Sequence, residues 1–169
     1  MEQLEITLVK QEELPRLAEL ASEIWHQHFP PIIGIAQVEY MVEKFQSLPA
    51  LTKAINEDGY RYYFLRVSGE PVGYIGIQPQ EHVLFLSKLY IKQAFRGRKL
   101  ARAGIDFLVA LCQEEGFDRI RLTCNRHNKN TLAAYDKMGF VVVCEQDADI
   151  GNGFVMNDYV MEKTVGADA

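Results

Sequence analysis

The sequence has the length and composition of one globular domain. It contains 169 residues, of which 48% are hydrophobic and 24% are charged, and its formal net charge is −5. These values exclude a disordered or fibrous chain, and the negative charge argues against a protein whose main task is to bind nucleic acid or an anionic membrane. We expect a single domain over residues 1–165, followed by a short tail over residues 166–169.

The first third of the chain is predicted to be mainly helical. Residues 6–8 alternate between apolar and polar and indicate a strand. A helix with a proline in its first turn should follow and end at Pro30 and Pro31, because proline cannot continue a helix. Two further helices are expected over about 37–47 and 49–56.

The rest of the chain predicts a meander of strands and then strands that alternate with helices. The predicted strands cover residues 60–67, 72–78, 82–92, 119–124, 140–145 and 154–163, and the predicted helices cover 100–115 and 129–138. The turn over residues 68–71 has the composition of a β-hairpin turn. This order predicts a mixed α/β fold with a mostly antiparallel sheet flanked by helices.

The cysteines and the apolar runs predict a cytoplasmic protein. Cys112, Cys124 and Cys144 form no Cys-x-x-Cys pair, and we expect buried, reduced thiols. A catalytic cysteine is the alternative, since His127 is close to Cys124 in sequence. No secretory signal is visible, and the apolar run over residues 107–112 is too short to cross a membrane.

The charge is divided unevenly along the chain. Residues 1–60 carry a net charge of −6 and residues 141–169 carry −5, whereas residues 88–102, which we call the basic segment, carry +6. The basic residues of this segment are Lys88, Lys92, Arg96, Arg98, Lys99 and Arg102. It joins a predicted strand to the start of a predicted helix, where free backbone N–H groups and the helix dipole suit a diphosphate.

Two alternatives for the basic segment stay open. It contains neither a nucleotide P-loop nor a Gly-x-Gly-x-x-Gly motif. Its charges could simply be solvated at an exposed helix start. A nucleic-acid surface is disfavoured because the series of aromatic residues expected for base stacking is not interleaved with the basic residues.

At two places the sequence resembles the GNAT superfamily of N-acetyltransferases. Arg96-Gly97-Arg98-Lys99-Leu100-Ala101 resembles the pyrophosphate motif Arg/Gln-x-x-Gly-x-Gly/Ala, and it follows Leu89-Tyr90-Ile91 as the motif follows a strand in that family. Asn125 to Phe140 resembles the family segment that ends in Tyr-x-Lys-x-Gly-Phe. One position departs from the pattern, since Lys99 stands where the family usually has glycine.

The resemblance implies a set of binding residues for acetyl-coenzyme A and no metal. The pyrophosphate would bind the loop and helix start formed by Arg96, Gly97, Arg98, Lys99, Leu100 and Ala101. The pantetheine arm would pair with the backbone of Leu89, Tyr90 and Ile91, which the family opens with a bulge. Asn128, Thr131 and Tyr135 complete the implied set. Asn128 is also predicted to stand at the N-cap of its helix.

The resemblance further implies that Tyr135 is the acid that protonates the departing thiolate. The alternative for Tyr135 is a packed aromatic residue with a satisfied hydroxyl. We assign no general base, because Leu86 to Leu89 contains no carboxylate. A chain of water molecules could serve as base. The candidates by residue type alone are Glu23, His26, His28, Glu81 and His82.

These inferences predict an N-acetyltransferase that moves an acetyl group directly to a primary amine in a ternary complex. The acidic terminal segments favour a small cationic acceptor, and the sequence is similar to small bacterial members of the family, some of them polyamine-directed. A homodimer is expected from the family, and neither nucleic acid nor a membrane is expected as a partner. The alternative is a non-catalytic acyl-coenzyme A-binding sensor or interaction protein on the same fold.

Overall fold

The computed structural model describes residues 4–165, so the predicted tail over 166–169 lies outside the described residues. The chain forms two compact units, and each is described by itself. The first holds the residues up to Gln78 together with Lys88–Gly104, and the second holds Pro79–Ser87 and the chain from Ile105 onward. The prediction of a single domain over residues 1–165 stays a prediction.

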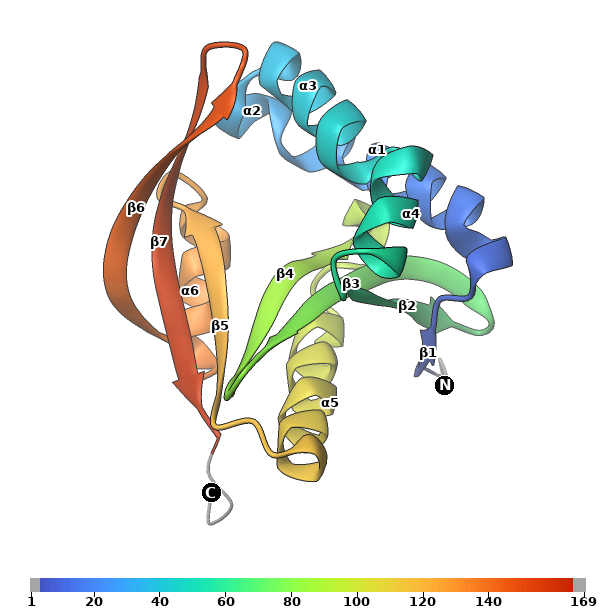
Figure 1. Cartoon of the computed structure of the whole chain (residues 1–169), viewed down its shortest axis with the longest axis vertical. Helices are drawn as coiled ribbons and strands as arrows, with labels where there is room; N and C mark the ends of the chain where they lie inside the picture. Colours follow the sequence, from blue (N-terminus) through green and yellow to red (C-terminus); the bar gives the residue numbers. More distant parts are fainter. Residues whose placement is uncertain (1–3, 166–169) are drawn as a thin grey trace. The chain divides into compact units, whose positions relative to one another are not determined.

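The elements follow the predicted order (Figure 1). The strands are β1 (Leu4–Leu8), β2 (Arg61–Val67), β3 (Glu70–Gln80), β4 (Val83–Ile91), β5 (Arg119–Asn125), β6 (Val141–Gly151) and β7 (Phe154–Thr164). The α-helices are α1 (Leu14–His28), α2 (Pro30–Ile33), α3 (Ile35–Gln46), α4 (Leu48–Asn56), α5 (Leu100–Glu115) and α6 (Lys129–Lys137). Two short 3₁₀-helices are η1 (Gln11–Glu13) and η2 (Gln93–Phe95). The hydrogen-bonded strand order is β1-β2-β3-β4-β5-β7-β6, which confirms the mixed, mostly antiparallel α/β fold.

In the first unit, helices pack on one face of an antiparallel meander. β1 pairs with β2, and β2 pairs with β3 through the predicted hairpin turn, where Ser68 and Gly69 both take left-handed backbone conformations. The apolar stripe of α1 is buried against aromatic side chains of β2 and β3. The members of this core include Leu14, Leu17, Leu20, Ala21, Ile24, Tyr62, Phe64 and Tyr74.

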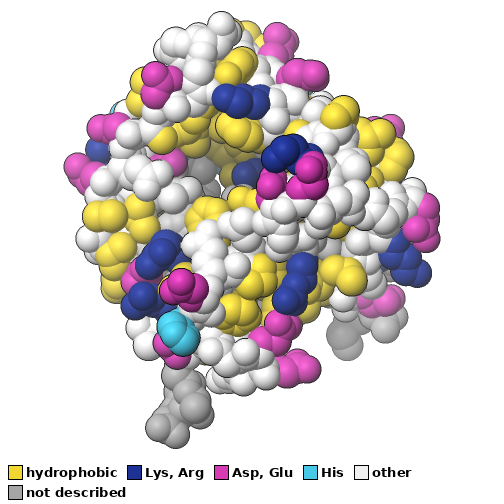
Figure 2. All heavy atoms as spheres, in the orientation of Figure 1, with side chains coloured by type: hydrophobic (Ala, Val, Ile, Leu, Met, Phe, Trp, Pro, Cys, Tyr) yellow, Lys and Arg dark blue, Asp and Glu magenta, His cyan; other side chains and the backbone are white. Residues whose placement is uncertain are grey.

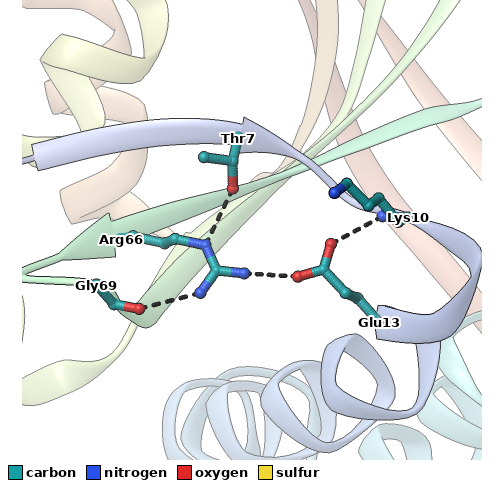
Figure 3. A network of polar contacts seen from close by, with 5 residues as sticks. All are labelled: Thr7, Lys10, Glu13, Arg66 and Gly69. Carbon is teal, nitrogen blue, oxygen red and sulfur yellow. Dashed lines mark hydrogen bonds and ion pairs between the residues drawn. The ribbon is translucent and has the colours of Figure 1, made fainter.

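The start of the first unit is held together by Arg66 on β2 (Figure 3). Its guanidinium donates to Thr7 Oγ1 on β1 at 3.0 Å, to the Gly69 carbonyl in the hairpin turn at 3.0 Å and to Glu13 Oε2 at 2.7 Å. Glu13 Oε1 in turn accepts the backbone N–H of Lys10 at 3.0 Å. One side chain therefore connects β1, β2, the turn before β3 and the entry to α1.

The second unit contains the parallel part of the sheet. The beginning of β4 pairs with β5 in parallel from Val83–Arg119 to Leu86–Leu122, with α5 as the crossover between the two strands. β5 pairs antiparallel with β7, and β7 pairs antiparallel with β6. The last two strands therefore form a hairpin that turns at Asn152 and Gly153.

Two predictions about the elements were wrong. Pro30 ends α1 as expected but also begins α2, because proline is well tolerated in the first turn of a new helix. β6 continues to Gly151 instead of ending at residue 145. Residues 146–151 are mostly polar, so they lack the apolar alternation that marks a strand, and their pairing with β7 defines this half of β6.

Candidate active site

β4 changes its pattern of burial in the middle of the strand. Val83, Leu84 and Leu86 are buried in its first half, and Leu89 and Ile91 are buried in its second half. After Val83 the buried positions move from even to odd numbers, which is the effect of one extra residue, as in a β-bulge. The register with β5 ends at Leu86. Leu89, Tyr90 and Ile91, the predicted pantetheine-binding residues, therefore lie beyond that register.

A short loop with left-handed residues leads from β4 to α5. After η2 the chain passes through Gly97, with a φ of +80°, and Lys99, with a φ of +62°. The first bond of α5 runs from the Ala103 N–H to the Lys99 carbonyl at 3.1 Å. The N–H groups of the first turn, which includes Leu100 and Ala101, therefore have no carbonyl within the helix to bind, and they lie at the positive end of its dipole.

Lys99 departs from the family pattern at a position whose backbone favours glycine. A side chain in the left-handed region costs about 1–2 kcal/mol. The Lys99 side chain is exposed, so it does not fill the interior of the loop. The departure therefore changes the residue type and adds a positive charge, while the backbone keeps the conformation that a glycine would adopt.

Several charges of the basic segment have partners that position them. Arg96 donates from Nε to the Ile91 carbonyl at 3.1 Å, which connects the loop to the end of β4, and partial burial lowers its pKa below the ordinary value. Arg98 stacks over the Phe95 ring, with 4.8 Å between its Cζ atom and the ring centroid. Lys92 Nζ lies 3.2 Å from a carboxylate oxygen of Glu23 on α1.

The second group of predicted residues lies on α6 in the second unit. Asn128 is the N-cap residue as predicted, and it is buried, but its side chain makes no capping hydrogen bond. The neighbouring Asn125 instead accepts the backbone N–H of His127 at its Oδ1 atom, at 2.9 Å. Thr131, which is half-buried, lies one turn before Tyr135 on the same helix face.

Tyr135 is buried and protonated at neutral pH. Its side chain is 7% exposed, and its ring meets the Phe140 ring edge-on with 5.3 Å between centroids. Burial raises the pKa of Tyr135 above its ordinary value, and the nearby Cys124 adds to the effect. The phenol is therefore chemically able to donate a proton and is also a packed core residue. The interpretation of Tyr135 as an acid is therefore compatible with its interpretation as a packed aromatic residue.

The two buried cysteines do not have the environment of nucleophiles. Cys112 and Cys124 are buried, as predicted, whereas Cys144 on β6 is exposed, contrary to the prediction. Burial, with the charge of Glu115, raises the pKa of Cys112 to about 11. Burial, with the charge of Asp158, raises the pKa of Cys124 to about 12. Both remain thiols at neutral pH, and the thiol is a poor nucleophile.

The structure places the candidate bases without selecting one. Glu23 is held by Lys92, and His26 Nδ1 lies 2.8 Å from the Ser22 carbonyl one turn earlier. The His28 ring packs against Phe29, with 4.7 Å between centroids. Glu81, in the turn between β3 and β4, and His82 after it are both exposed.

Many carboxylates of the acidic terminal segments are engaged in ion pairs. These pairs are Glu13–Arg66, Glu23–Lys92, Asp58–Lys53, Glu145–Arg126, Asp147–Arg126, Glu162–Arg119 and Glu162–Arg121. Figure 2 shows basic and acidic side chains next to one another on the face drawn, rather than one continuous acidic surface. The net charge of a segment therefore overstates the free negative charge that an acceptor would meet.

Sequence reasoning missed a buried polar chain in the first unit. Trp25 Nε1 donates to the Tyr74 hydroxyl at 3.0 Å, and that hydroxyl donates to Gln46 Oε1. The available signal was a glutamine and a tyrosine in otherwise apolar patterns. Within residues 4–165, no helix is long and apolar enough to cross a membrane, and no group of three or more His, Cys, Asp and Glu side chains could hold a metal ion.

Comparison with known proteins gives a consistent set of relatives. The pattern of the acetyltransferase (GNAT) family matches residues 16–140. The uncharacterized N-acetyltransferase YjgM of Escherichia coli is 30% identical over 98 residues, which are 56% of this chain and 59% of that protein. YdgE of Bacillus subtilis, also named an uncharacterized N-acetyltransferase, is 28% identical over 93 residues, which are 50% of this chain and 59% of that protein. The chain therefore spans less than two thirds of the length of these curated relatives.

Solved structures of acetyltransferases share this fold. The PaiA N-acetyltransferase from Thermoplasma acidophilum, solved in complex with coenzyme A, superimposes with a TM-score of 0.80. The comparison covers 96% of this chain and 99% of that chain at 22% identity. This likeness concerns the fold.

Proposed function

The chain belongs to the acetyltransferase (GNAT) family, and from this premise we propose that it is an acetyl-coenzyme A-dependent N-acetyltransferase. It would move an acetyl group to a primary amine of a small cationic acceptor by direct transfer in a ternary complex. The observation that carries the proposal is the succession of three features along the chain. The end of β4 lies beyond its pairing with β5, a loop with left-handed backbone at Gly97 and Lys99 follows, and the N-terminus of α5 comes next.

Each part of this arrangement suits one part of the cofactor. The first-turn N–H groups of α5, with Arg98 and Lys99 beside them, would bind the pyrophosphate. The backbone of Leu89, Tyr90 and Ile91 would pair with the amide groups of pantetheine, as one strand pairs with another. A backbone N–H of this segment would polarise the thioester carbonyl. The coenzyme A complex of the PaiA protein supports this part of the proposal.

The chemical step transfers the acetyl group without a covalent enzyme intermediate. The acceptor ammonium first loses a proton through water to solvent, and the neutral amine nitrogen then attacks the thioester carbonyl carbon. The new C–N bond forms as the C–S bond breaks, and the nitrogen releases its second proton through water to solvent, which leaves the neutral amide. Tyr135 then gives its hydroxyl proton to the coenzyme A thiolate and is reprotonated from solvent. The Tyr135 hydroxyl is protonated at neutral pH, as an acid must be, while its raised pKa makes it a weaker donor than an ordinary tyrosine.

Fewer observations support the proposed class of acceptor than support the proposed cofactor. The negative charge of residues 1–60 and 141–169 favours a cation, such as a polyamine, an aminoglycoside or a peptide amine. We also propose a cytoplasmic protein, since its three cysteines are free thiols. A homodimer belongs to the same proposal, and light scattering would test it.

A thiol-release assay with acetyl-coenzyme A tests the function. The panel should contain polyamines, aminoglycosides, amino acids and peptides with a free N-terminus, and mass spectrometry should confirm a gain of one acetyl group on the amine. We expect release with at least one cationic member of the panel. Release that requires the three cysteines, while coenzyme A still binds without them, would contradict direct transfer.

A non-catalytic acyl-coenzyme A sensor is the second candidate. The observation in its favour is that Leu86–Leu89 carries no carboxylate, while Glu23 is paired with Lys92. Coenzyme A binding measured by calorimetry, together with no thiol release across the whole panel, would support the sensor and contradict the enzyme.

A further inference from the structure

The half-buried side chain of Tyr90, in the proposed pantetheine-binding segment, contacts three aromatic rings. The centroid of its ring lies 5.4 Å from that of Trp25, 5.6 Å from that of Phe29 and 5.8 Å from that of Tyr74. The contacts with Trp25 and Phe29 are edge-on, a favourable geometry for aromatic pairs. Trp25 and Phe29 come from the end of α1, so α1 and β4 meet at Tyr90.

Alternation along the strands explains why Tyr90 points to α1. Leu89 and Ile75 lie on the opposite face, against Gly104 of α5, where a Cβ atom would lie 3.3 Å from each of their side chains. Side chains alternate between faces along a strand, so Tyr90 and Tyr74 point away from α5. Tyr90 therefore has its side chain against α1 and its backbone in the segment proposed to bind pantetheine.

Two of the rings around Tyr90, those of Trp25 and Tyr74, are held by the buried hydrogen-bond chain. Tryptophan can only donate, so the Trp25 N–H gives its hydrogen to the Tyr74 hydroxyl at 3.0 Å, and the Tyr74 hydrogen is directed to Gln46. Tyr74 and Gln46 are fully buried. The direction of the chain is determined at each member, which holds Trp25 and Tyr74 in one relative orientation.

The backbone of Tyr90 is confined as well. A Cβ atom at Gly73 on β3 would lie 2.6 Å from the Tyr90 carbonyl oxygen, so only glycine allows this close approach. One residue later, the Lys92 N–H donates to the Val72 carbonyl at 2.8 Å, and Lys92 Nζ pairs with Glu23 on α1. α1 is thus joined to the end of β4 by an ion pair and by ring contacts.

We propose that Trp25 and Tyr74 are positioning residues that act through Tyr90 on the cofactor-binding backbone of β4. They hold the segment from Leu89 to Ile91 in the conformation that pairs with pantetheine. A ligand on this backbone is consequently sensed at the end of α1. This inference rests on the proposed function, because it requires that coenzyme A binds to β4.

The protein contains a natural fluorescent reporter for the test. Trp25 is the only tryptophan among the 169 residues, and it contacts Tyr90 directly. Binding of coenzyme A should be followed by calorimetry and by selectively excited tryptophan emission in the same titration. We expect the emission of Trp25 to change in proportion to the bound fraction. Phosphoadenosine diphosphate, which has the nucleotide but lacks pantetheine, should bind without this change.

Three variants separate positioning from core packing. Tyr90→Leu removes the ring contacts, and we expect an emission change at least about threefold smaller and a coenzyme A dissociation constant about three- to tenfold higher. Tyr90→Phe keeps the ring and should restore both values to the wild-type range. Tyr60→Leu is the matched control, because Tyr60 stacks on Tyr62 at 6.4 Å in the same aromatic core. It should lower thermal stability while leaving both readouts within about twofold of wild type.

The outcomes distinguish this inference from the function on which it rests. Absence of coenzyme A binding by calorimetry would overturn the proposed function, and the positioning role with it. Normal binding with no change in Trp25 emission would overturn the positioning role alone. An equal loss of response in Tyr90→Leu and Tyr60→Leu would show that general loosening of the core is responsible, and would also overturn it.

Discussion

Tyr135 is the residue on which the proposed chemistry depends most directly. We predict that Tyr135→Phe lowers kcat by about 10²-fold or more, the usual range for loss of a general acid, with a small change in the dissociation constant of coenzyme A. The phenyl ring keeps its contact with Phe140, so the helix should remain packed. Steady-state thiol release and calorimetry measure the two quantities.

The control for Tyr135→Phe is Tyr159→Phe, which removes a hydroxyl from a half-buried tyrosine on β7 in the same unit. It should leave kcat within about twofold of wild type. An unchanged kcat in Tyr135→Phe, measured where the chemical step limits the rate, would contradict the assignment of the acid.

Lys99 allows the backbone and the charge of the loop to be tested apart. Lys99→Gly and Lys99→Ala remove the same positive charge, and only glycine relieves the left-handed conformation at a φ of +62°. We predict that Lys99→Gly is more stable than Lys99→Ala by about 1 kcal/mol in urea unfolding. Both should weaken coenzyme A binding by about two- to fivefold, since each loses one exposed cation near the pyrophosphate.

The opposite stability order for the two Lys99 variants would show that the left-handed conformation is not kept in solution. Unchanged coenzyme A binding in both would show that Lys99 faces away from the phosphates. The two results are independent, because the first concerns the free protein and the second concerns the complex.

At the scale of the elements, Arg66 joins parts of the first unit that are distant in sequence (Figure 3). We predict that Arg66→Met lowers the free energy of unfolding by about 1–2 kcal/mol, since the variant leaves the Glu13 carboxylate and the Gly69 carbonyl without this donor. The side chains of this pair are 21% and 28% exposed, which places the estimate above that for a surface pair.

Lys53→Met is the matched control for Arg66→Met. Its ion pair with Asp58 is longer, at 3.2 Å against 2.7 Å for Arg66 and Glu13, and the two side chains are 62% and 43% exposed. The loss should therefore be smaller than about 0.5 kcal/mol. Equal losses in the two variants would mean that the contacts of Arg66 with β1 and the hairpin turn contribute nothing beyond an exposed pair. Chemical denaturation followed by circular dichroism provides the comparison.

The sequence predicted the bounds of helices and strands well where one face of the element is buried and the other is exposed. The bounds of α5 were predicted correctly, because its apolar residues repeat at helical spacing up to Gly116. The loop before it was located by its charges and its glycine, and the α6 motif by its residue types. The second half of β6 was missed because residues 146–151 are mostly polar, and the exposure of Cys144 was missed because it lies in an apolar run that is exposed in the structure.

The remaining features of the site depend on contacts between distant elements. Trp25, Gln46 and Tyr74 come from α1, α3 and β3, and no local periodicity relates them. The pairing of Glu23 with Lys92 likewise joins residues of α1 and the end of β4. Segment charges were informative about the basic segment, where no acidic residue intervenes, and less so about the acidic segments, whose carboxylates are partly neutralised by nearby basic residues.

At the scale of the whole molecule, buried thiols and phenols should make the fold sensitive to alkaline pH. The raised pKa values of about 11 for Cys112 and about 12 for Cys124 mean that the folded protein keeps these protons after the unfolded chain has lost them. A group whose pKa is raised on folding contributes stability that is present below its unfolded pKa and is lost as the pH rises toward its folded pKa. Burial raises the pKa values of Tyr62, Tyr74 and Tyr135 in the same direction.

We therefore predict that the free energy of unfolding falls above about pH 9, where the unfolded thiols ionise, and falls more steeply above about pH 10, where the unfolded phenols follow. Each buried thiol should contribute a slope of up to about 1.4 kcal/mol per pH unit between its two pKa values. Cys124→Ala should be less stable at neutral pH because of the cavity, yet should show a shallower decline. Cys144→Ala, which removes an exposed thiol, is the control and should keep the wild-type slope. Urea unfolding at several pH values measures the slopes, and equal slopes for wild type and Cys124→Ala would show that the Cys124 thiolate is tolerated in the folded state.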